Sequence, residues 1–89
     1  MVRVHTDELD LDNERRFWYD GVPFTGVGFE ESNGARPHCE IEFRDGWMHG
    51  ASRDFFSDGS TKAETILVRG LRHGLDVEFD RDGRVLVER

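Results

Sequence analysis

The residues of this sequence that could carry out chemistry are four histidines, one cysteine and many carboxylates. His49 and His73 could share a metal ion, but zinc sites take three or four ligands. Neither a cysteine pair nor a third histidine lies near them in the sequence. Both histidines precede a glycine at the same place of a repeated pattern, which is more typical of a structural role. We therefore predict no metal site.

His38 and Cys39 are adjacent, and a histidine can serve as the base of a cysteine nucleophile. Adjacent side chains of a strand point to opposite faces, so these two cannot meet directly. The carboxylates are interleaved with arginines, as on a solvated face, and a thin sheet offers little of the cleft that paired catalytic acids need. The serines lack the context of a nucleophile elbow, and the glycines lack the strand–loop–helix of a phosphate loop. The sequence predicts no catalytic residue and no cofactor.

Glycines recur with one period, and this period predicts how the chain is organised. The same interval of about 24 residues, typical of a repeat architecture, separates Gly46 from Gly70 and also separates Gly26, Gly50 and Gly74 in succession. A second series has nearly the same interval and consists of Asn33-Gly34, Asp58-Gly59 and Asp82-Gly83. Such dipeptides favour type I′ hairpin turns, in which both central residues need positive φ. Each unit is expected to contain a strand, an Asp-Gly turn, a second strand and a longer Gly-x-x-x-Gly turn.

The segments between the glycines have the period-two alternation of strands with one apolar face. Cys39, Ile41 and Phe43 alternate with charged residues, and residues 75–79 follow the same pattern. A step of one repeat preserves it, which places Cys39, Ala63 and Val87 in one column that should extend across neighbouring units.

The composition of two further segments predicts their secondary structure. Residues 61–68 fit a strand better than a helix because glycines bound them closely and their last residues favour strands. Residues 14–19 are expected to form a strand that runs into the first turn. Residues 6–16 are either an irregular acidic lead-in or a weak first hairpin.

The sequence thus predicts an all-β fold, an antiparallel β-meander built from about three repeats of about 24 residues each. We expect a single domain over residues 1–89, with an acidic lead-in and first strand at 1–19 and repeats at 20–44, 45–68 and 69–89. Apolar residues occur at both parities in places. The sheet therefore either keeps an exposed apolar stripe or twists until both faces are mostly covered.

The charge balance is acidic, with 19 Asp and Glu against 12 Lys and Arg and a net charge of −7. Residues 1–34 hold eight of the acids and three of the bases, so the excess is greatest there. This balance argues against direct contact with nucleic acid or anionic lipid, and it favours either plain solubility or attraction to a basic partner. The single cysteine excludes an internal disulfide. No signal peptide or membrane span is evident, so we expect a cytoplasmic protein.

One unit has the pattern F-x-D-G-x-x-H-G, followed by an aromatic pair and an Asp-Gly turn. Phe43–Gly50, Phe55–Phe56 and Asp58–Gly59 carry it, and it resembles the MORN-variant repeat. The segment from Asp7 to Val27 is similar to the start of small bacterial YwqK-type antitoxins. The resemblance implies a β-meander of MORN-like repeats that binds a toxin, often a deaminase-type or nuclease toxin, without catalysis. The first repeat departs from the pattern, with one extra residue in its turn and no aromatic pair, and residues 30–38 are divergent.

On this basis we expect an antitoxin or immunity protein that occludes the basic nucleic-acid-binding cleft of a cognate toxin. Carboxylates would stand in for phosphates, and aromatic side chains would supply buried anchors. The candidate partner-binding residues are Asp7, Glu8, Asp10, Asp12, Trp18, Glu30, Glu31, Trp47 and Phe56. The alternative is a scaffold module that self-associates through sheet edges or binds another cellular protein. Membrane association is expected to be absent.

Overall fold

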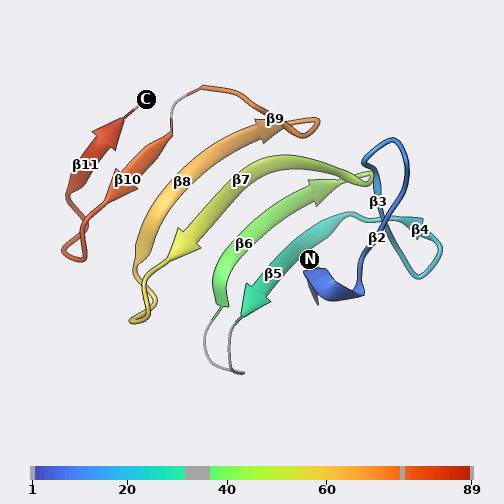
Figure 1. Cartoon of the computed structure of the whole chain (residues 1–89), viewed down its shortest axis with the longest axis horizontal. Helices are drawn as coiled ribbons and strands as arrows, with labels where there is room; N and C mark the ends of the chain where they lie inside the picture. The colour runs from blue at the N-terminus through green and yellow to red at the C-terminus, as the bar shows by residue number, and fades with distance from the viewer. Residues whose placement is uncertain (1, 32–36, 75, 89) are drawn as a thin grey trace.

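A computed structural model describes residues 2–31, 37–74 and 76–88. The fold is all-β, as predicted, and the described residues form two sheets and one short 3₁₀ helix (Figure 1). The main sheet has the spatial order β1 (Arg3–His5), β5 (Gly26–Glu31), β6 (Pro37–Arg44), β7 (Trp47–Phe55), β8 (Thr61–Val68), β10 (Val77–Phe79) and β11 (Val85–Glu88), with β9 (Leu71–Arg72) also paired to β8. The small sheet contains β2 (Asp10–Leu11), β3 (Phe17–Tyr19) and β4 (Val22–Pro23), and η1 (Thr6–Glu8) precedes it.

From β5 to β11 the main sheet is an antiparallel meander, because each strand pairs with the strand before it or with a near neighbour in the chain. Strand β1 is different, since it pairs with β5 in the parallel direction. The chain leaves β1, forms η1 and the small sheet, and returns to the main sheet running the same way. The predicted antiparallel meander did not include this parallel strand at the edge of the sheet.

Two-residue turns with positive φ at both positions join three pairs of strands, the geometry of a type I′ turn. The φ values are 51° and 83° in Asp20-Gly21, 51° and 90° in Asp45-Gly46, and 52° and 85° in Arg69-Gly70. The glycine series predicted a chain reversal at each of these three places, but as a longer Gly-x-x-x-Gly turn, so the two-residue type I′ geometry was not predicted.

Longer loops make the other reversals, at residues 12–16, 56–60 and 80–84. In each, the backbone N–H of the first residue donates to the carbonyl of the fifth, at 3.1, 2.8 and 2.9 Å. Positive φ occurs only at Arg15, Gly59 and Gly83, with φ of 67°, 92° and 88°. Asp58-Gly59 and Asp82-Gly83 do mark reversals, but the type I′ geometry expected of them is wrong. Asn33-Gly34 lies outside the described residues.

The longer Gly-x-x-x-Gly turn is also wrong. Strand β7 begins at Trp47, directly after the two-residue turn, and continues through Gly50. Gly50 has φ of 112° within the strand, and the Glu42 side chain lies where a β-carbon would be. The second glycine of the motif therefore serves a strand irregularity, where the ladder between β6 and β7 shifts register.

Strand β8 confirms the prediction for residues 61–68, whereas the strand expected over residues 14–19 covers only Phe17–Tyr19. Residues 6–16 contain η1, β2 and the loop of a first hairpin, which settles the choice left open for them in favour of the hairpin.

One row crosses the main sheet and contains the predicted column. The residues paired in succession along it are Glu30, Cys39, Asp54, Ala63, Glu78 and Val87. Cys39, Ala63 and Val87 do share this row, but Asp54 and Glu78 lie between them. A register shift follows Glu30, Asp54 and Glu78, so the same irregularity recurs once in every repeat. Residues opposed in an antiparallel ladder share a face, so all six side chains lie on one face of the sheet.

The core sits at the N-terminal side of the sheet. Val4, Phe24 and Phe43 are buried, and the half-buried side chains packed against them are Leu9, Phe17, Tyr19, Ile41 and Met48. The C-terminal side is open. Its exposed apolar side chains are Ile66, Val68, Leu71, Val85, Leu86 and Val87. The sheet has therefore not curled until both faces are covered, and six of the nine exposed large apolar side chains among the described residues lie on strands β8, β9 and β11.

Candidate partner-binding surface

Three carboxylates, Glu30 on β5, Asp54 on β7 and Glu78 on β10, form what we call the acid row. One strand separates each from the next, which places them about 9.6 Å apart along the row. Between and beyond them lie Cys39, Ala63 and Val87, so no base interrupts the row. The acid row is a line of negative charge across the sheet.

The pKa of the Cys39 thiol is affected by the carboxylates of this face. Its burial, together with the negative charges of Asp54 and Glu30, raises the pKa of Cys39 to about 12. The thiol is therefore protonated at neutral pH, whereas a cysteine nucleophile needs a thiolate. Cys39 is buried, as expected of a small core residue.

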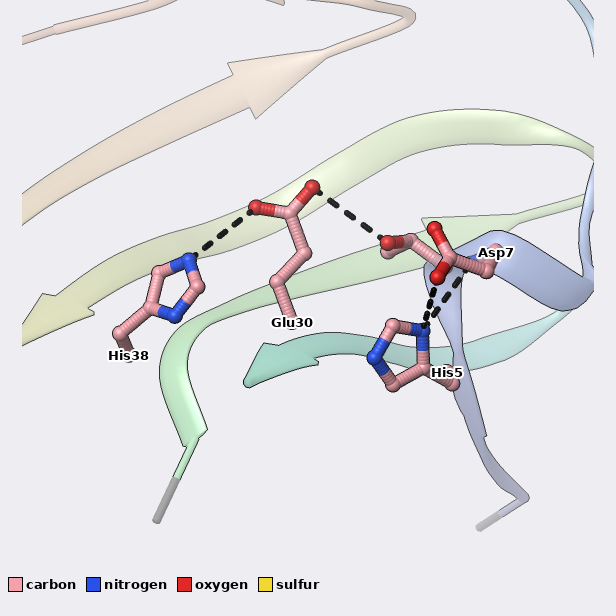
Figure 2. A network of polar contacts seen from close by, with 5 residues as sticks. His5, Asp7, Glu30 and His38 are labelled. Carbon is pink, nitrogen blue, oxygen red and sulfur yellow. Dashed lines mark hydrogen bonds and ion pairs between the residues drawn. The ribbon is translucent and has the colours of Figure 1, made fainter. Parts of the chain in front are cut away.

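Glu30 joins the acid row to the N-terminal segment. Thr6 Oγ1 donates to Glu30 Oε1 at 3.3 Å, and His38 Nε2 lies 3.7 Å from Glu30 Oε2. Figure 2 shows His38 and Glu30 directed toward one another, with His5 and Asp7 beside the same edge. The backbone N–H of Asp7 donates to His5 Nδ1 at 3.2 Å, and the Asp7 carboxylate is 88% exposed. The structure thus brings the predicted residues Asp7 and Glu30 to one side of the sheet.

Asp12 has a structural task in the loop at residues 12–16. Its Oδ1 accepts the backbone N–H groups of Glu14 and Arg16 at 2.8 and 2.9 Å, and its Oδ2 accepts Trp18 Nε1–H at 2.8 Å. The hydrogen bond from Trp18, followed by that from the Arg16 backbone, lowers the pKa of Asp12. Asp12 is thus engaged within its own loop and differs in this from the exposed acids.

Arg16 lies between the two tryptophans. Its guanidinium carbon is 5.4 Å from the ring centre of Trp18 and 5.8 Å from that of Trp47, and its Nε donates to the Asp45 carbonyl at 2.9 Å. The cation therefore ties the small sheet to the turn between β6 and β7. Both tryptophans were predicted from the sequence, whereas Arg16 was not, because no local pattern shows that distant residues share one cation.

An apolar pocket of about 240 Å³ lies beside Trp47, between the small sheet and strands β7 and β9. Its lining residues are Leu11, Glu14, Arg15, Phe17, Trp47, Met48, Arg69, Gly70 and Leu71. Leu11 and Leu71 are 55% and 73% exposed. The pocket is a place where a partner could insert an apolar side chain with basic and acidic groups at its rim.

The predicted residues do not form one continuous site. Phe56 lies in the loop between β7 and β8, and Arg81 stacks on its ring at 5.1 Å. Trp47 begins β7 at the opposite end of that strand. Glu8 lies in η1 and Asp10 on β2, both exposed, and Glu31 ends β5. Four of the acids lie on η1 and β5, namely Asp7, Glu8, Glu30 and Glu31. Asp10 and Asp12 lie beside Trp18 in the small sheet, both tryptophans contact Arg16, and Phe56 stands apart.

Within residues 2–31, 37–74 and 76–88, no group of three or more His, Cys, Asp and Glu side chains could hold a metal ion. The same described part of the chain contains no helix with the length and apolar character needed to cross a membrane. Comparison with known protein families, curated proteins and solved structures finds no match. The resemblance to MORN-variant repeats therefore stays a prediction.

Proposed function

We propose that this chain is an antitoxin or immunity protein that binds a basic cognate toxin and blocks its substrate cleft. The observation that carries the proposal is the acid row, in which Glu30, Asp54 and Glu78 present a line of carboxylates on one face. A cleft that binds nucleic acid is lined with Lys and Arg, so this face offers it a substitute for phosphates.

The overall charge and the N-terminal acids support the same proposal. The net charge of −7 would speed encounter with a basic partner. Asp7 and Glu8 are exposed and follow Thr6, which donates to Glu30, whereas Asp10 is exposed on β2 of the small sheet. On the opposite face, Glu40 and Glu64 form ion pairs with Arg3 and Arg53.

Co-expression with the product of the neighbouring gene tests the proposal. A one-to-one complex that abolishes toxicity is expected. Its affinity should fall at least about tenfold when ionic strength rises, because exposed charges are screened. Asp54→Asn should weaken inhibition about fivefold through the loss of one interfacial charge. Asp20→Asn is the matched control, since Asp20 is an exposed turn residue with φ of 51° and asparagine tolerates that conformation. An affinity for the toxin that changes neither with ionic strength nor with Asp54→Asn would refute the proposal that these carboxylates mimic phosphates.

A scaffold module that self-associates or binds another cellular protein is the second candidate. The exposed apolar side chains of β8, β9 and β11 favour it, because such surface is commonly covered by another molecule. Sedimentation of the purified protein separates the two candidates. An oligomer of the protein alone that buries the exposed side chains of β8, β9 and β11 would support the scaffold, and a complex with toxin through the acid row would support the antitoxin.

A further inference from the structure

Positive charge gathers around Trp47, although the chain as a whole has a net charge of −7. Next to the apolar pocket lies a second cavity of about 430 Å³, which we call the basic cavity. Residues of the turns at 45–46 and 69–70 both contribute to its walls. Its polar and aromatic lining residues are Arg16, Arg44, Asp45, Trp47, His49 and Arg69. Three arginines thus face one aspartate in this cavity, which is the reverse of the balance in the whole chain.

Two arginines of this region occupy turn positions that favour other residues. Arg69 has φ of 52°, and the two equivalent turns place aspartate there, Asp20 and Asp45, each with φ of 51°. Arg15, which lines the apolar pocket, has φ of 67° where both related loops have glycine. Positive φ is strained for a long side chain and is commoner for aspartate and asparagine. Local preference therefore explains neither arginine, and such exceptions are expected where a side chain has a functional task.

Arg16 is held in a fixed position at the basic cavity. Its Nε donates to the Asp45 carbonyl at 2.9 Å, and its guanidinium carbon lies 5.8 Å from the ring centre of Trp47. Gly46 permits this approach, because a β-carbon there would lie 2.6 Å from Arg16 Cγ. Within the described residues only Nε of this side chain forms a hydrogen bond, so both Nη atoms can donate to a ligand. A guanidinium fixed in advance loses less conformational entropy when it binds an anion.

The other cations of the basic cavity are not neutralised by the protein itself. Within the described ranges, the side chains of Arg44 and Arg69 form no hydrogen bond and no ion pair. Two carboxylates lie near the cavity, since Asp45 lines it and Asp12 attracts Arg16. Guanidinium groups bind carboxylates through pairs of hydrogen bonds. The cavity is therefore complementary to a ligand that carries carboxylates.

The apolar pocket adjoins the basic cavity, because Trp47 and Arg69 line both. Leu11 and Leu71 line the apolar pocket and are 55% and 73% exposed. An extended polypeptide advances about 3.3 Å per residue, so residues close in sequence can enter neighbouring cavities. An acidic peptide segment with one large apolar side chain would occupy both cavities, whereas a small free anion would use only the basic one.

We propose that the surface around Trp47 binds an acidic peptide segment. One large apolar side chain of the segment enters the apolar pocket, and neighbouring carboxylates bind Arg16, Arg44 and Arg69. This site does not rest on the proposed function, because it uses cations and not the acid row. Its failure would appear in a peptide titration of the protein alone, and failure of the proposed function would appear in the inhibition assay.

Fluorescence anisotropy of a labelled hexapeptide, one phenylalanine flanked by glutamates, tests the ligand chemistry. Wild type should bind it with a dissociation constant on the order of 100 μM, despite the net repulsion between two acidic molecules. Glutamine in place of every glutamate, or glycine in place of phenylalanine, should each weaken binding at least about tenfold. Adenosine monophosphate should displace the labelled peptide less effectively than the unlabelled peptide does. Absent binding, equal binding of the glutamine peptide, or stronger displacement by the nucleotide would overturn the proposal.

Arg69→Asp tests the site without disturbing the turn, because aspartate is the residue of the equivalent turns. It should weaken peptide binding more than about tenfold, and the urea midpoint of unfolding should not fall below that of wild type. Arg84→Asp is the matched control, since Arg84 is exposed in the turn between β10 and β11, far from the start of β7 (Figure 1). It makes the same change in net charge and should weaken binding less than about twofold.

Arg44→Gln removes a second cation and should weaken peptide binding about fivefold, with Arg84→Gln as its control. If Arg69→Asp and Arg44→Gln bound the peptide no more weakly than the matched Arg84 variants, the assignment of the site to the basic cavity would be overturned. Equal weakening by all four variants would show that net charge alone governs binding, which would also overturn it.

Discussion

The carboxylate of Glu42 lies beside Gly50, in the space that a β-carbon would fill, and its Oε2 accepts the backbone N–H of Ala51 at 2.6 Å. This bond bridges the point where β6 and β7 shift register. Ile66 of β8 stands one repeat after Glu42 and has no carboxylate to offer. There the outer partner of β8 is divided into β9 and β10.

Replacing Gly50 tests this bridge. Gly50→Ala should lower the free energy of unfolding by about 3 kcal/mol, because the methyl group meets Glu42 and the residue must keep positive φ. Gly74→Ala should cost only about 1 kcal/mol, since Gly74 has φ of 87° but open space around its β-position. Urea unfolding monitored by circular dichroism measures both. Equal losses would show that backbone strain alone accounts for the effect.

Arg16 should contribute to stability through its position between two rings. Arg16→Ala is expected to lower the free energy of unfolding by about 2 kcal/mol, through two cation–π contacts and the hydrogen bond to Asp45. Tryptophan emission should shift to longer wavelength as the small sheet loosens. Arg81→Ala removes one cation–π contact with Phe56 and an exposed attraction to Asp58, and should cost about 0.5 kcal/mol. An Arg16 variant no less stable than the Arg81 variant would contradict this role.

The carboxylate of Asp12 should make the free energy of unfolding depend on pH in the acid range. Its pKa in the folded state is lowered from 3.8, chiefly by the hydrogen bond from Trp18. A lowered folded pKa means that the ionised carboxylate stabilises the fold above pH 3.8, and that this contribution is lost as pH falls through the folded value. Asp12→Asn should therefore be less stable than wild type at neutral pH and lose less stability on acidification. Unfolding curves of both proteins between neutral pH and about pH 2 measure this difference. If the free energies of unfolding of wild type and Asp12→Asn fell in parallel with pH, the prediction would be contradicted.

The Cys39 thiol should react slowly with thiol reagents in the native protein. A pKa raised from 9.0 to about 12 lowers the thiolate fraction at neutral pH about 1000-fold relative to an ordinary cysteine. The folded state prefers the protonated form, so this group also makes stability fall as pH rises above 9.0. Absorbance during labelling with a disulfide reagent, in native buffer and in urea, measures the difference. Equal rates in both conditions would show that the thiol is accessible and unperturbed.

The fold class, the places of the chain reversals and the cross-sheet row were predictable, because glycine spacing and apolar alternation are local signals with a shared period, whereas the type of turn at each reversal was not. The loop at residues 12–16 was left open because Arg15 takes the positive φ of 67° that glycine takes in the related loops. The role of Gly50 was missed because it depends on Glu42, which belongs to the neighbouring strand.

The candidate site was predictable only in part. Asp7, Glu8 and Glu30 were chosen from a local excess of acids, and they do lie near one another. Asp54 and Glu78 were not chosen, although they take the place of Glu30 in the next two repeats. Asp54 and Glu78 could have been predicted from their spacing, because strands in register bring acids at the same place of successive repeats to the same face of the sheet.

The one-sided core should make the molecule open from its C-terminal side. Buried side chains gather where the small sheet meets β5, β6 and β7, whereas the hairpin of β10 and β11 has only half-buried and exposed ones. Amide hydrogens of β10 and β11 should therefore exchange with solvent deuterons through local fraying, at rates far above those of β6. The last hairpin would then be the least persistent unit of the native ensemble, and a molecule that pairs with it would slow its exchange before that of any other strand.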